Sequence, residues 1–290
     1  MEKSTNIFRF KRFDVINERS AMKVNTDGVL LGAAMTILPS DRRVLDIGTG
    51  TGTIALMAAQ RLTDMRKRSF AVAKDDMECN QDRSQDVQEG GIVMSSEAET
   101  SPLHIDAIDI DEPSATEAAE NFRRSTWSGI LHAHHASLDE FAARVRDGIL
   151  PSDKEDSEEF DLICSNPPYF DNALQAPEQR RNAARHTSTG LSYREILDFA
   201  ASVLAPEGRV AMVLPADTEN DLTRHARMNG LYLYNIIRVR TVPRKAPKLI
   251  IVEFGRHRPE QTQDTIFTIQ NEGQYTQEYL FLTKDFYLFA

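Results

Sequence analysis

Short apolar runs of strand length alternate with helical patterns through the middle of the chain. The clearest unit is a strand at 44–47, a tight glycine loop at 48–52 and an alanine-rich helix at 53–62. Further elements follow the same alternation, with strands predicted at 105–109, 131–135, 160–165 and 209–214 and helices at 113–124, 139–146 and 192–204. This alternation predicts an α/β fold: a doubly wound, mostly parallel sheet that binds ligands at the carboxyl ends of its strands.

The two ends of the chain depart from this alternation. Residues 8–11 alternate apolar and basic, which is typical of an edge strand, and Asp27 can cap an apolar helix over 29–35. Residues 232–239 and 249–254 are β-rich runs around a loop of Pro, Lys and Arg, so they predict a hairpin. We therefore expect an N-terminal strand-and-helix segment over 1–40, a main domain over 41–258 and a C-terminal extension over 259–290.

One long polar stretch interrupts the main domain. Residues 64–103 show no sustained period and little apolar surface, so we expect a flexible acidic insertion there. The whole chain has 41% hydrophobic and 27% charged residues and a formal net charge of −10. This charge excludes a generally basic nucleic-acid coat, but it leaves room for a local basic groove because a ligand feels the local field.

Composition also bounds the cellular context. The chain starts without an apolar stretch of signal-peptide length, and nowhere do about 18 apolar residues run together. The two cysteines, Cys79 and Cys164, give neither a disulfide framework nor the spacing of a zinc site. We therefore expect a cytoplasmic enzyme or binding protein with no membrane anchor and no metal.

The glycine loop carries the first chemical motif, because it follows a strand and opens a helix. A dinucleotide-binding loop would have the spacing Gly-x-Gly-x-x-Gly and no acid two residues before its first glycine. An acid there would repel a pyrophosphate, but it suits the cationic methionine end of S-adenosylmethionine (SAM). The residues predicted to bind this cofactor are Asp46, Gly48, Thr49, Gly50 and Gly52. The alternative is a tight turn without a ligand.

The end of the next strand carries two acids. Asp109 is the last residue of the strand at 105–109, where a carboxylate can accept both ribose hydroxyls of an adenosine cofactor. Asp111 is better suited to cap the helix that opens at Pro113. We place Asp109 and the adjacent Ile110 at the cofactor.

The most specific motif is Asn166-Pro167-Pro168-Tyr169, directly after the strand at 160–165. The prolines stiffen the loop and donate no hydrogen bond, so their carbonyls are aimed acceptors. The Asn166 amide oxygen and the Pro167 carbonyl can together receive the two hydrogens of an amino group, and Tyr169 offers a face on which a planar group stacks. Such a site fits an sp² amine, for example adenine N6 or a glutamine side-chain amide. The alternative is an ordinary proline-rich turn.

These motifs resemble those of class I SAM-dependent methyltransferases that act on amino groups. Three further segments, 8–13, 22–32 and 184–187, make the chain similar to the bacterial family that methylates N6 of adenosine 37 in tRNA1(Val). The likeness covers residues 6–63 and 104–255. It implies a seven-stranded Rossmann-like sheet whose last strand is antiparallel, with a methyltransferase domain over 41–258. It also implies in-line methyl transfer from SAM without a metal, the anticodon loop of tRNA as partner and a monomeric enzyme.

The resemblance assigns further residues to the site. It places Thr26 and Asp27 at the cofactor or target pocket, although Asp27 as a helix cap explains them equally well. Ser137, followed by Asp139, stands where such enzymes often have an acid that meets the cofactor adenine, so either the Ser137 hydroxyl recognises the adenine or the register differs by two residues. Basic residues near the motifs are predicted to contact RNA phosphates. These are Lys11, Arg12, Arg181, Arg185, His186, Arg244 and Lys245.

Several other functions remain open at this point. The same motif serves enzymes that methylate adenine N6 in ribosomal RNA or N5 of a protein glutamine. A non-catalytic RNA-binding protein with this fold is a different class, and the intact loops argue against it. The glycine spacing argues against a nicotinamide-dependent oxidoreductase.

Overall fold

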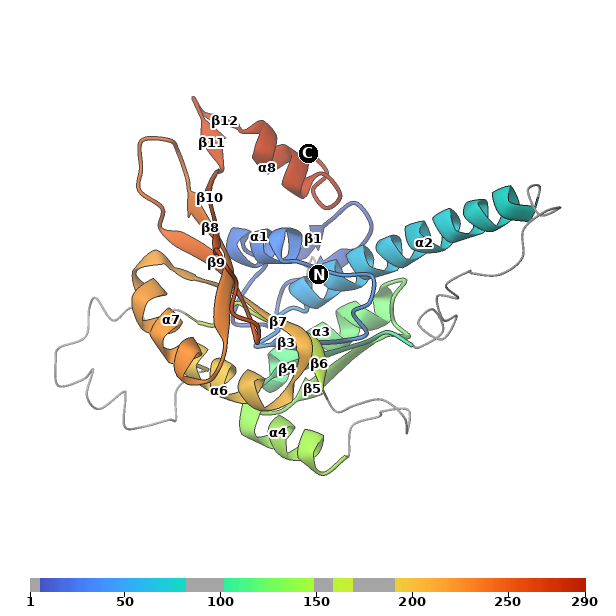
Figure 1. Ribbon diagram of the computed structural model, residues 1–290, viewed down its shortest axis with the longest axis horizontal. Helices are drawn as coiled ribbons and strands as arrows, with labels where there is room; N and C mark the ends of the chain where they lie inside the picture. The colour runs from blue at the N-terminus through green and yellow to red at the C-terminus, as the bar shows by residue number, and fades with distance from the viewer. Residues whose placement is uncertain (1–5, 82–101, 149–158, 169–190) are drawn as a thin grey trace, which may run out of the picture.

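A single eight-stranded sheet organises the chain (Figure 1). The computed structural model describes residues 6–81, 102–148, 159–168 and 191–290, and within 70–81 only the backbone. Along the sheet the strands are β10 (Gln263–Thr268), β8 (Tyr232–Arg240), β9 (Leu249–Gly255), β7 (Leu204–Pro215), β6 (Phe160–Ser165), β3 (Arg43–Ile47), β4 (His104–Asp109) and β5 (Leu131–His135). Neighbours are parallel except at β9, which runs antiparallel to both β7 and β8.

The predicted fold class is confirmed by this topology. Seven strands form the expected doubly wound sheet, and β8 and β9 form the hairpin expected at 232–254. The eighth strand, β10, was missed in the sequence, and it pairs in parallel with β8 at the edge of the sheet. β10 is exposed along most of its length, so its sequence lacks the apolar run that marks an interior strand.

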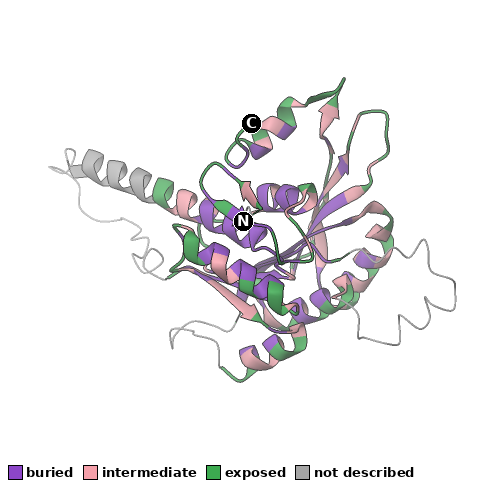
Figure 2. Ribbon diagram, turned by 180° about the vertical axis from the view of Figure 1, so that it is seen from behind, coloured by how far each residue is buried: buried purple, intermediate pink, exposed green. Residues whose placement is uncertain are grey.

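Along the interior strands, successive side chains point alternately into two separate hydrophobic cores, one on each face of the sheet. Val44 and Leu162 belong to one core, whereas their neighbours Leu45 and Ile163 belong to the other. The first face is covered by α1 (Thr26–Ala34), α2 (Thr53–Gln81), α3 (Glu112–Arg124) and α8 (Gln277–Thr283). The second face is covered by α4 (Leu138–Arg146), α6 (Tyr193–Val203) and α7 (Glu219–Met228). The interior strands β3, β6, β7 and β9 are therefore largely buried on both sides (Figure 2), which explains their continuous apolar runs.

Smaller elements complete the chain. A hairpin of β1 (Ile7–Arg9) and β2 (Asp14–Ile16) lies near the N-terminus, and a hairpin of β11 (Gln270–Asn271) and β12 (Gln274–Tyr275) precedes α8. A 3-10 turn, η2 (Ala216–Thr218), joins β7 to α7. Among the helices of the described ranges, none is long and apolar enough to cross a bilayer.

Helix α2 is longer than the sequence predicts. It continues past residue 62 to Gln81, so residues 64–81, expected to begin a flexible insertion, are helical. No glycine or proline interrupts 53–81, so the sequence contains no residue that must end the helix at 62, and the polar composition of 64–81 gives it no apolar period. Asp64 pairs with Arg12, and Arg66 donates to the carbonyl of Asp41, so the first turn of this stretch is tied to the body. The rest of the expected insertion, 82–101, lies outside the described residues.

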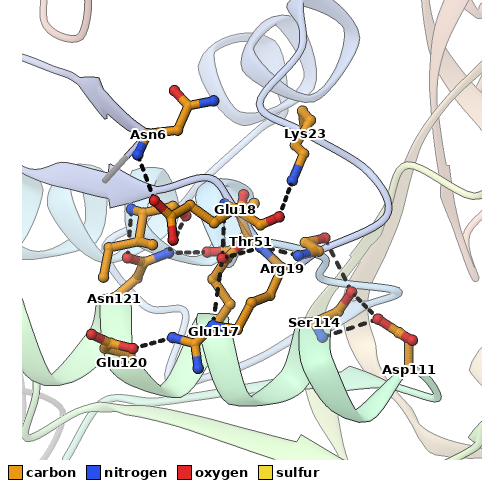
Figure 3. A network of polar contacts seen from close by, with 12 residues as sticks. Asn6, Glu18, Arg19, Lys23, Thr51, Asp111, Ser114, Glu117, Glu120 and Asn121 are labelled. Atoms are coloured by element: carbon orange, nitrogen blue, oxygen red, sulfur yellow. Dashed lines mark hydrogen bonds and ion pairs between the residues drawn. The ribbon is translucent and has the colours of Figure 1, made fainter. Parts of the chain in front are cut away.

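A buried carboxylate on α3 holds the segment that leads from β2 to α1 (Figure 3). Glu117 is fully buried, and it accepts hydrogen bonds from the backbone N–H of Glu18 at 2.9 Å, Arg19 at 2.6 Å and Ser20 at 3.2 Å. One turn further along α3, Asn121 donates to the carbonyl of Thr51 in the glycine loop at 2.9 Å and accepts from the N–H of Ile16 at 2.8 Å. Helix α3 therefore joins the N-terminal segment to the glycine loop.

Removal of Glu117 should destabilise the protein strongly. Glu117→Ala leaves backbone donors of residues 18–20 without their acceptor, which we expect to cost roughly 3 kcal/mol in the free energy of unfolding. Glu120 lies on the same helix, is partly exposed and forms an ion pair with Arg19, so Glu120→Ala should cost less than about 1 kcal/mol. Urea denaturation of both variants would measure the difference, and equal losses would contradict the anchoring role of Glu117.

Candidate active site

The glycine loop follows β3 and turns sharply into α2. Gly48, Gly50 and Gly52 all have positive φ, at +71°, +57° and +82°, which side chains rarely adopt. A Cβ on Gly52 would lie 2.5 Å from Phe122 Cε1, so this glycine lets α3 pack closely. A Cβ on Gly50 would lie 3.3 Å from Ser20 Oγ, so this glycine lies under the N-terminal segment. The glycines of this loop thus allow close packing of α3 at Gly52 and of the N-terminal segment at Gly50.

Asp46 is a buried acid beneath this loop. Its Oδ2 accepts from Thr49 Oγ1 at 2.7 Å and from the N–H of Ala55 at 3.2 Å, in the first turn of α2. Its Oδ1 is buried, with no hydrogen-bond partner among the described residues. Burial, with a smaller effect of Asp109, raises the pKa of Asp46 to about 7. A buried acceptor of this kind fits a cationic ligand, which would replace the solvent that the carboxylate has lost.

Asp109 ties the glycine loop to the end of β4. It accepts from the N–H of Gly50 at 2.8 Å through Oδ2 and from the N–H of Asp111 at 2.9 Å through Oδ1. Each oxygen retains a second lone pair that can receive a hydroxyl. Burial raises the pKa of Asp109. Ile110 beside it is 69% exposed, which fits an apolar platform for a planar group. Asp111 caps α3, as predicted.

The N-terminus of α1 lies against Asn166. Asn25, not Asp27, is the N-cap of α1: its Oδ1 accepts from the N–H of Gly28 at 2.8 Å. The same oxygen lies 3.4 Å from Asn166 Nδ2, which donates to it. Thr26 and Asp27 form the first turn of α1 and therefore lie beside this contact. The sequence offers Asn, Thr and Asp in a row as caps, so local pattern could not select Asn25.

The register of the sheet brings Asn166 to the same edge as the glycine loop. Ser165 pairs with Ile47 and donates through Oγ to its carbonyl at 2.7 Å, so Asn166 emerges beside Gly48. Asn166 is 6% exposed, Pro167 is buried and Pro168 is exposed. Tyr169 lies outside the described residues. The structure thus brings the glycine loop, the end of β4, the start of α1 and Asn166 together, while the role of each remains a prediction.

Ser137 has a clear structural role at the end of β5. Its hydroxyl caps α4 by accepting from the N–H of Glu140 at 3.2 Å. The Glu140 carboxylate in turn accepts from the N–H of Ser137 at 2.8 Å. The adjacent N–H of Ala136 donates to the carbonyl of Asp109 at 3.0 Å, so this cap lies next to the end of β4. The predicted contact of Ser137 with the cofactor stays a prediction.

The predicted RNA-binding residues fall into three groups. Arg244 and Lys245 are exposed in the loop between β8 and β9, which is at the carboxyl end of the sheet because Leu249 pairs with Pro215. Lys11 donates to the carbonyls of Lys284 and Ala290 at 2.6 and 2.8 Å, and Arg12 pairs with Asp64 and lies 5.4 Å from the Trp127 ring centroid. Arg181, Arg185 and His186 lie outside the described residues.

The aromatic residues around Lys11 serve the core. Phe10 and Phe13 are 4% and 7% exposed, and their rings stack at 4.6 Å. Phe10 also stacks on Tyr287 at 5.9 Å, so the motif at 8–13 joins the two ends of the chain. RNA binding by Lys11 and Arg12 stays a prediction. Within the residues described, no group of three His, Cys, Asp or Glu side chains is placed to hold a metal ion.

Comparison with known proteins shows that the chain is a methyltransferase. Residues 34–241 match the family described as "RMKL-like, methyltransferase domain". The crystal structure of a predicted O-methyltransferase from Agrobacterium tumefaciens superposes with a TM-score of 0.55 over 90% of this chain and 96% of that chain, at 13% identity, which shows the shared fold. The protein is a class I methyltransferase, and SAM is the methyl donor of this class.

Relatives of nearly equal length then define the family. The chain is 34% identical over 285 residues to a tRNA1(Val) (adenine(37)-N6)-methyltransferase of Bacteroides fragilis, which covers 98% of this chain and 99% of the relative. It is 33% identical to the protein of that name from Flavobacterium psychrophilum, over 97% of this chain and 99% of the relative. The chain belongs to the tRNA1(Val) (adenine(37)-N6)-methyltransferase family.

Asp46 should make SAM binding depend on pH. Because burial raises its pKa from 3.8 to about 7, the folded site below pH 7 holds a proton that is released when a cation binds beside the carboxylate. SAM affinity should therefore rise between about pH 5 and pH 7, by up to about tenfold per pH unit, and then level off. Titration calorimetry in buffers of different ionisation enthalpy would detect the released proton.

Asp46→Asn supplies the control for this prediction. The variant should bind SAM more weakly and lose the pH slope. Stability gives an independent check: between about pH 4 and pH 7 the folded protein holds a proton that the unfolded chain has lost, so stability should fall as the pH rises. That fall should be absent in Asp46→Asn. A slope in SAM affinity that survives the substitution would show that another group titrates.

Proposed function

We propose that this protein transfers a methyl group from SAM to N6 of adenosine 37 in tRNA1(Val). The observation that carries the proposal is the position of Asn166 and Pro167, buried at the carboxyl end of β6 between the glycine loop and the start of α1. The names of full-length relatives support the choice of substrate. Because its substrate is tRNA, we expect the enzyme to act in the cytoplasm.

The residues around the glycine loop would hold the cofactor. Asp46 Oδ1 is buried and has no hydrogen-bond partner among the described residues, which suits the cationic methionine end of SAM. Asp109 keeps acceptor capacity for the ribose hydroxyls, and exposed Ile110 offers an apolar surface to the adenine. When bound, SAM supplies an electrophilic methyl group on a sulfonium. The protein residues orient it toward the target and exclude water from it.

The Asn-Pro-Pro-Tyr motif would hold the target base. The adenine must leave the stacked loop to reach a buried site, as in other enzymes that act on a base. The Asn166 amide oxygen and the Pro167 carbonyl then accept the two N6 hydrogens, and these acceptors stabilise the positive charge that develops on nitrogen in the transition state. We assign stacking of the base to Tyr169 on the sequence motif.

The exposed basic loop 241–248 would dock the RNA. It contains Arg244, Lys245 and Lys248, all exposed, at the same end of the sheet as Asn166. Phosphate contacts by such residues supply affinity that is independent of base sequence, so the overall charge of −10 is no obstacle. Arg181, Arg185 and His186 remain candidates for the same role from the sequence.

Transcripts of defined sequence test the proposed substrate. Unmodified tRNA1(Val) incubated with the enzyme and labelled SAM should gain one methyl group, recovered as N6-methyladenosine at position 37 after nuclease digestion. A transcript with adenosine 37 replaced by guanosine should gain none. Label in ribosomal RNA or on protein glutamine, with none in the tRNA, would overturn the proposal in favour of one of those substrates.

Asn166→Ala should impair turnover more than binding. Loss of one preorganised acceptor should slow single-turnover methyl transfer by about 10²–10³-fold, because the hydrogen bond gains strength as charge builds on N6. SAM affinity should stay within about threefold, since Asp46 and Asp109 remain. Asn229→Ala, at the C-terminal end of α7, is the matched control and should leave turnover unchanged. Near-wild-type turnover in Asn166→Ala would rule out the proposed mechanism.

A further inference from the structure

The carboxamide of Asn166 has two chemically different ends that must be told apart. The oxygen end accepts hydrogen bonds and the NH₂ end donates them. The proposed reaction requires the oxygen to face the target amine, because an NH₂ group there would meet another donor. The two ends have nearly the same shape, so packing alone selects weakly between them. A fixed acceptor beside the NH₂ end would select the productive orientation.

Asn25 supplies such an acceptor. Its Oδ1 accepts from Asn166 Nδ2 at 3.4 Å while also accepting from the N–H of Gly28 at 2.8 Å. The bond to Gly28 caps α1, so it determines which end of the Asn25 amide points this way. Met22 Sδ, 3.7 Å from the same Nδ2, adds a weak second acceptor. The NH₂ end of Asn166 is therefore turned toward residues 22–25.

Asn25 itself stands on a fixed segment. Asn17 is buried, and its Oδ1 accepts from the N–H of Val24 at 3.0 Å, next to Asn25. Lys23 donates to the carbonyl of Glu18 at 2.6 Å, and Glu117 holds the backbone of residues 18–20 (Figure 3). The segment also begins before residue 34, where the match to the methyltransferase domain starts. The acceptor thus comes from outside that domain but is anchored to it through α3.

We propose that Asn25 is a positioning residue that holds the Asn166 amide with its oxygen toward the target amine. The inference rests on the proposed function of Asn166. Asn25 acts through Asn166, and its contribution belongs to the rate of methyl transfer and not to the binding of SAM. Through Asn25, the N-terminal segment contributes a residue to the proposed active site.

Three substitutions separate this role from helix capping. Asn25→Asp keeps an acceptor for both Gly28 and Asn166, so turnover should stay within about threefold of wild type. Asn25→Ser keeps a good cap, but its hydroxyl lies closer to the backbone and loses Asn166, so turnover should fall about tenfold with little change in the unfolding midpoint. Asn25→Ala loses both contacts and should lower turnover and the midpoint together.

Thr276→Ala is the matched control for lost capping. Thr276 caps α8 by accepting from the N–H of Tyr279 at 3.1 Å, and it makes no contact with the described residues of the site. It should lower the unfolding midpoint about as much as Asn25→Ala does and leave turnover unchanged. If Thr276→Ala slowed methyl transfer as much as Asn25→Ala, the loss would be a general effect of stability and the inference would fail.

A double-mutant cycle gives the decisive readout. If Asn25 acts through Asn166, Asn25→Ser should slow single-turnover transfer about tenfold in the wild type and have almost no effect in an Asn166→Ala background. An equal loss in both backgrounds, or unchanged turnover in Asn25→Ser, would overturn the positioning role. So would a loss explained by weaker SAM binding. In those cases the role of Asn166 would stand. Normal turnover in Asn166→Ala would defeat the proposed role of Asn166 and this inference together, whereas absence of N6-methyladenosine at position 37 with the wild-type enzyme would defeat the proposed function itself.

Discussion

The buried carboxylate of Glu117 is the constraint on which the architecture of the site depends. It accepts three consecutive backbone N–H groups from the segment between β2 and α1, and these donors have no place in any sheet or helix. A buried donor without an acceptor is costly, so the segment is held where Glu117 stands. Asn121, one turn away, bonds to the glycine loop. Two side chains of one helix thus set the distance between the glycine loop and the segment that joins β2 to α1.

The anchoring by Glu117 also affects the position of Asn166, the proposed catalytic residue. The segment anchored by Glu117 ends at Asn25, whose oxygen contacts both the start of α1 and the Asn166 amide. Ser20 from the same segment lies close to Gly50, where a side chain would interfere. Residues before position 34, where the match to the methyltransferase family starts, therefore line one side of the candidate site. The hydrogen bonds to Glu117 explain how a segment without regular secondary structure is held in one position.

Buried acids give the site its electrostatic character. Asp46 and Asp109 stand at the ends of adjacent strands, and burial raises the pKa of both. Asp46 is fully buried and Asp109 is partly buried, so their charged forms are unfavourable in the protein alone, and a cationic cofactor beside them would offset that cost. The basic loop 241–248 is exposed at the same end of the sheet. In the proposed function the two acids bind the cationic cofactor and the basic loop binds the anionic RNA.

The sequence by itself determined what depends on local pattern. The interior strands are apolar because both faces of the sheet are buried, so their positions could be predicted. The predicted ends of β3 and β6 also agree with the structure, in which Asp46 lies near the end of β3 and Asn166 directly follows β6. The positive φ of Gly48, Gly50 and Gly52 likewise follows from their spacing in a tight turn. By contrast, the edge strand β10 and the outer part of α2 are largely exposed or polar and carry no apolar period.

Only the tertiary structure decided contacts between distant parts of the chain. Asn25 and Asn166 are 141 residues apart, and Glu117 and Arg19 are 98 apart, so no local pattern links them. The motif at 8–13 shows the same limit, because alternating Phe and basic residues suit either an RNA surface or the core. The fold buries Phe10 and Phe13 and bonds Lys11 to the far end of the chain. A pattern records which residues are apolar or charged, but which partner each one meets depends on how the elements pack.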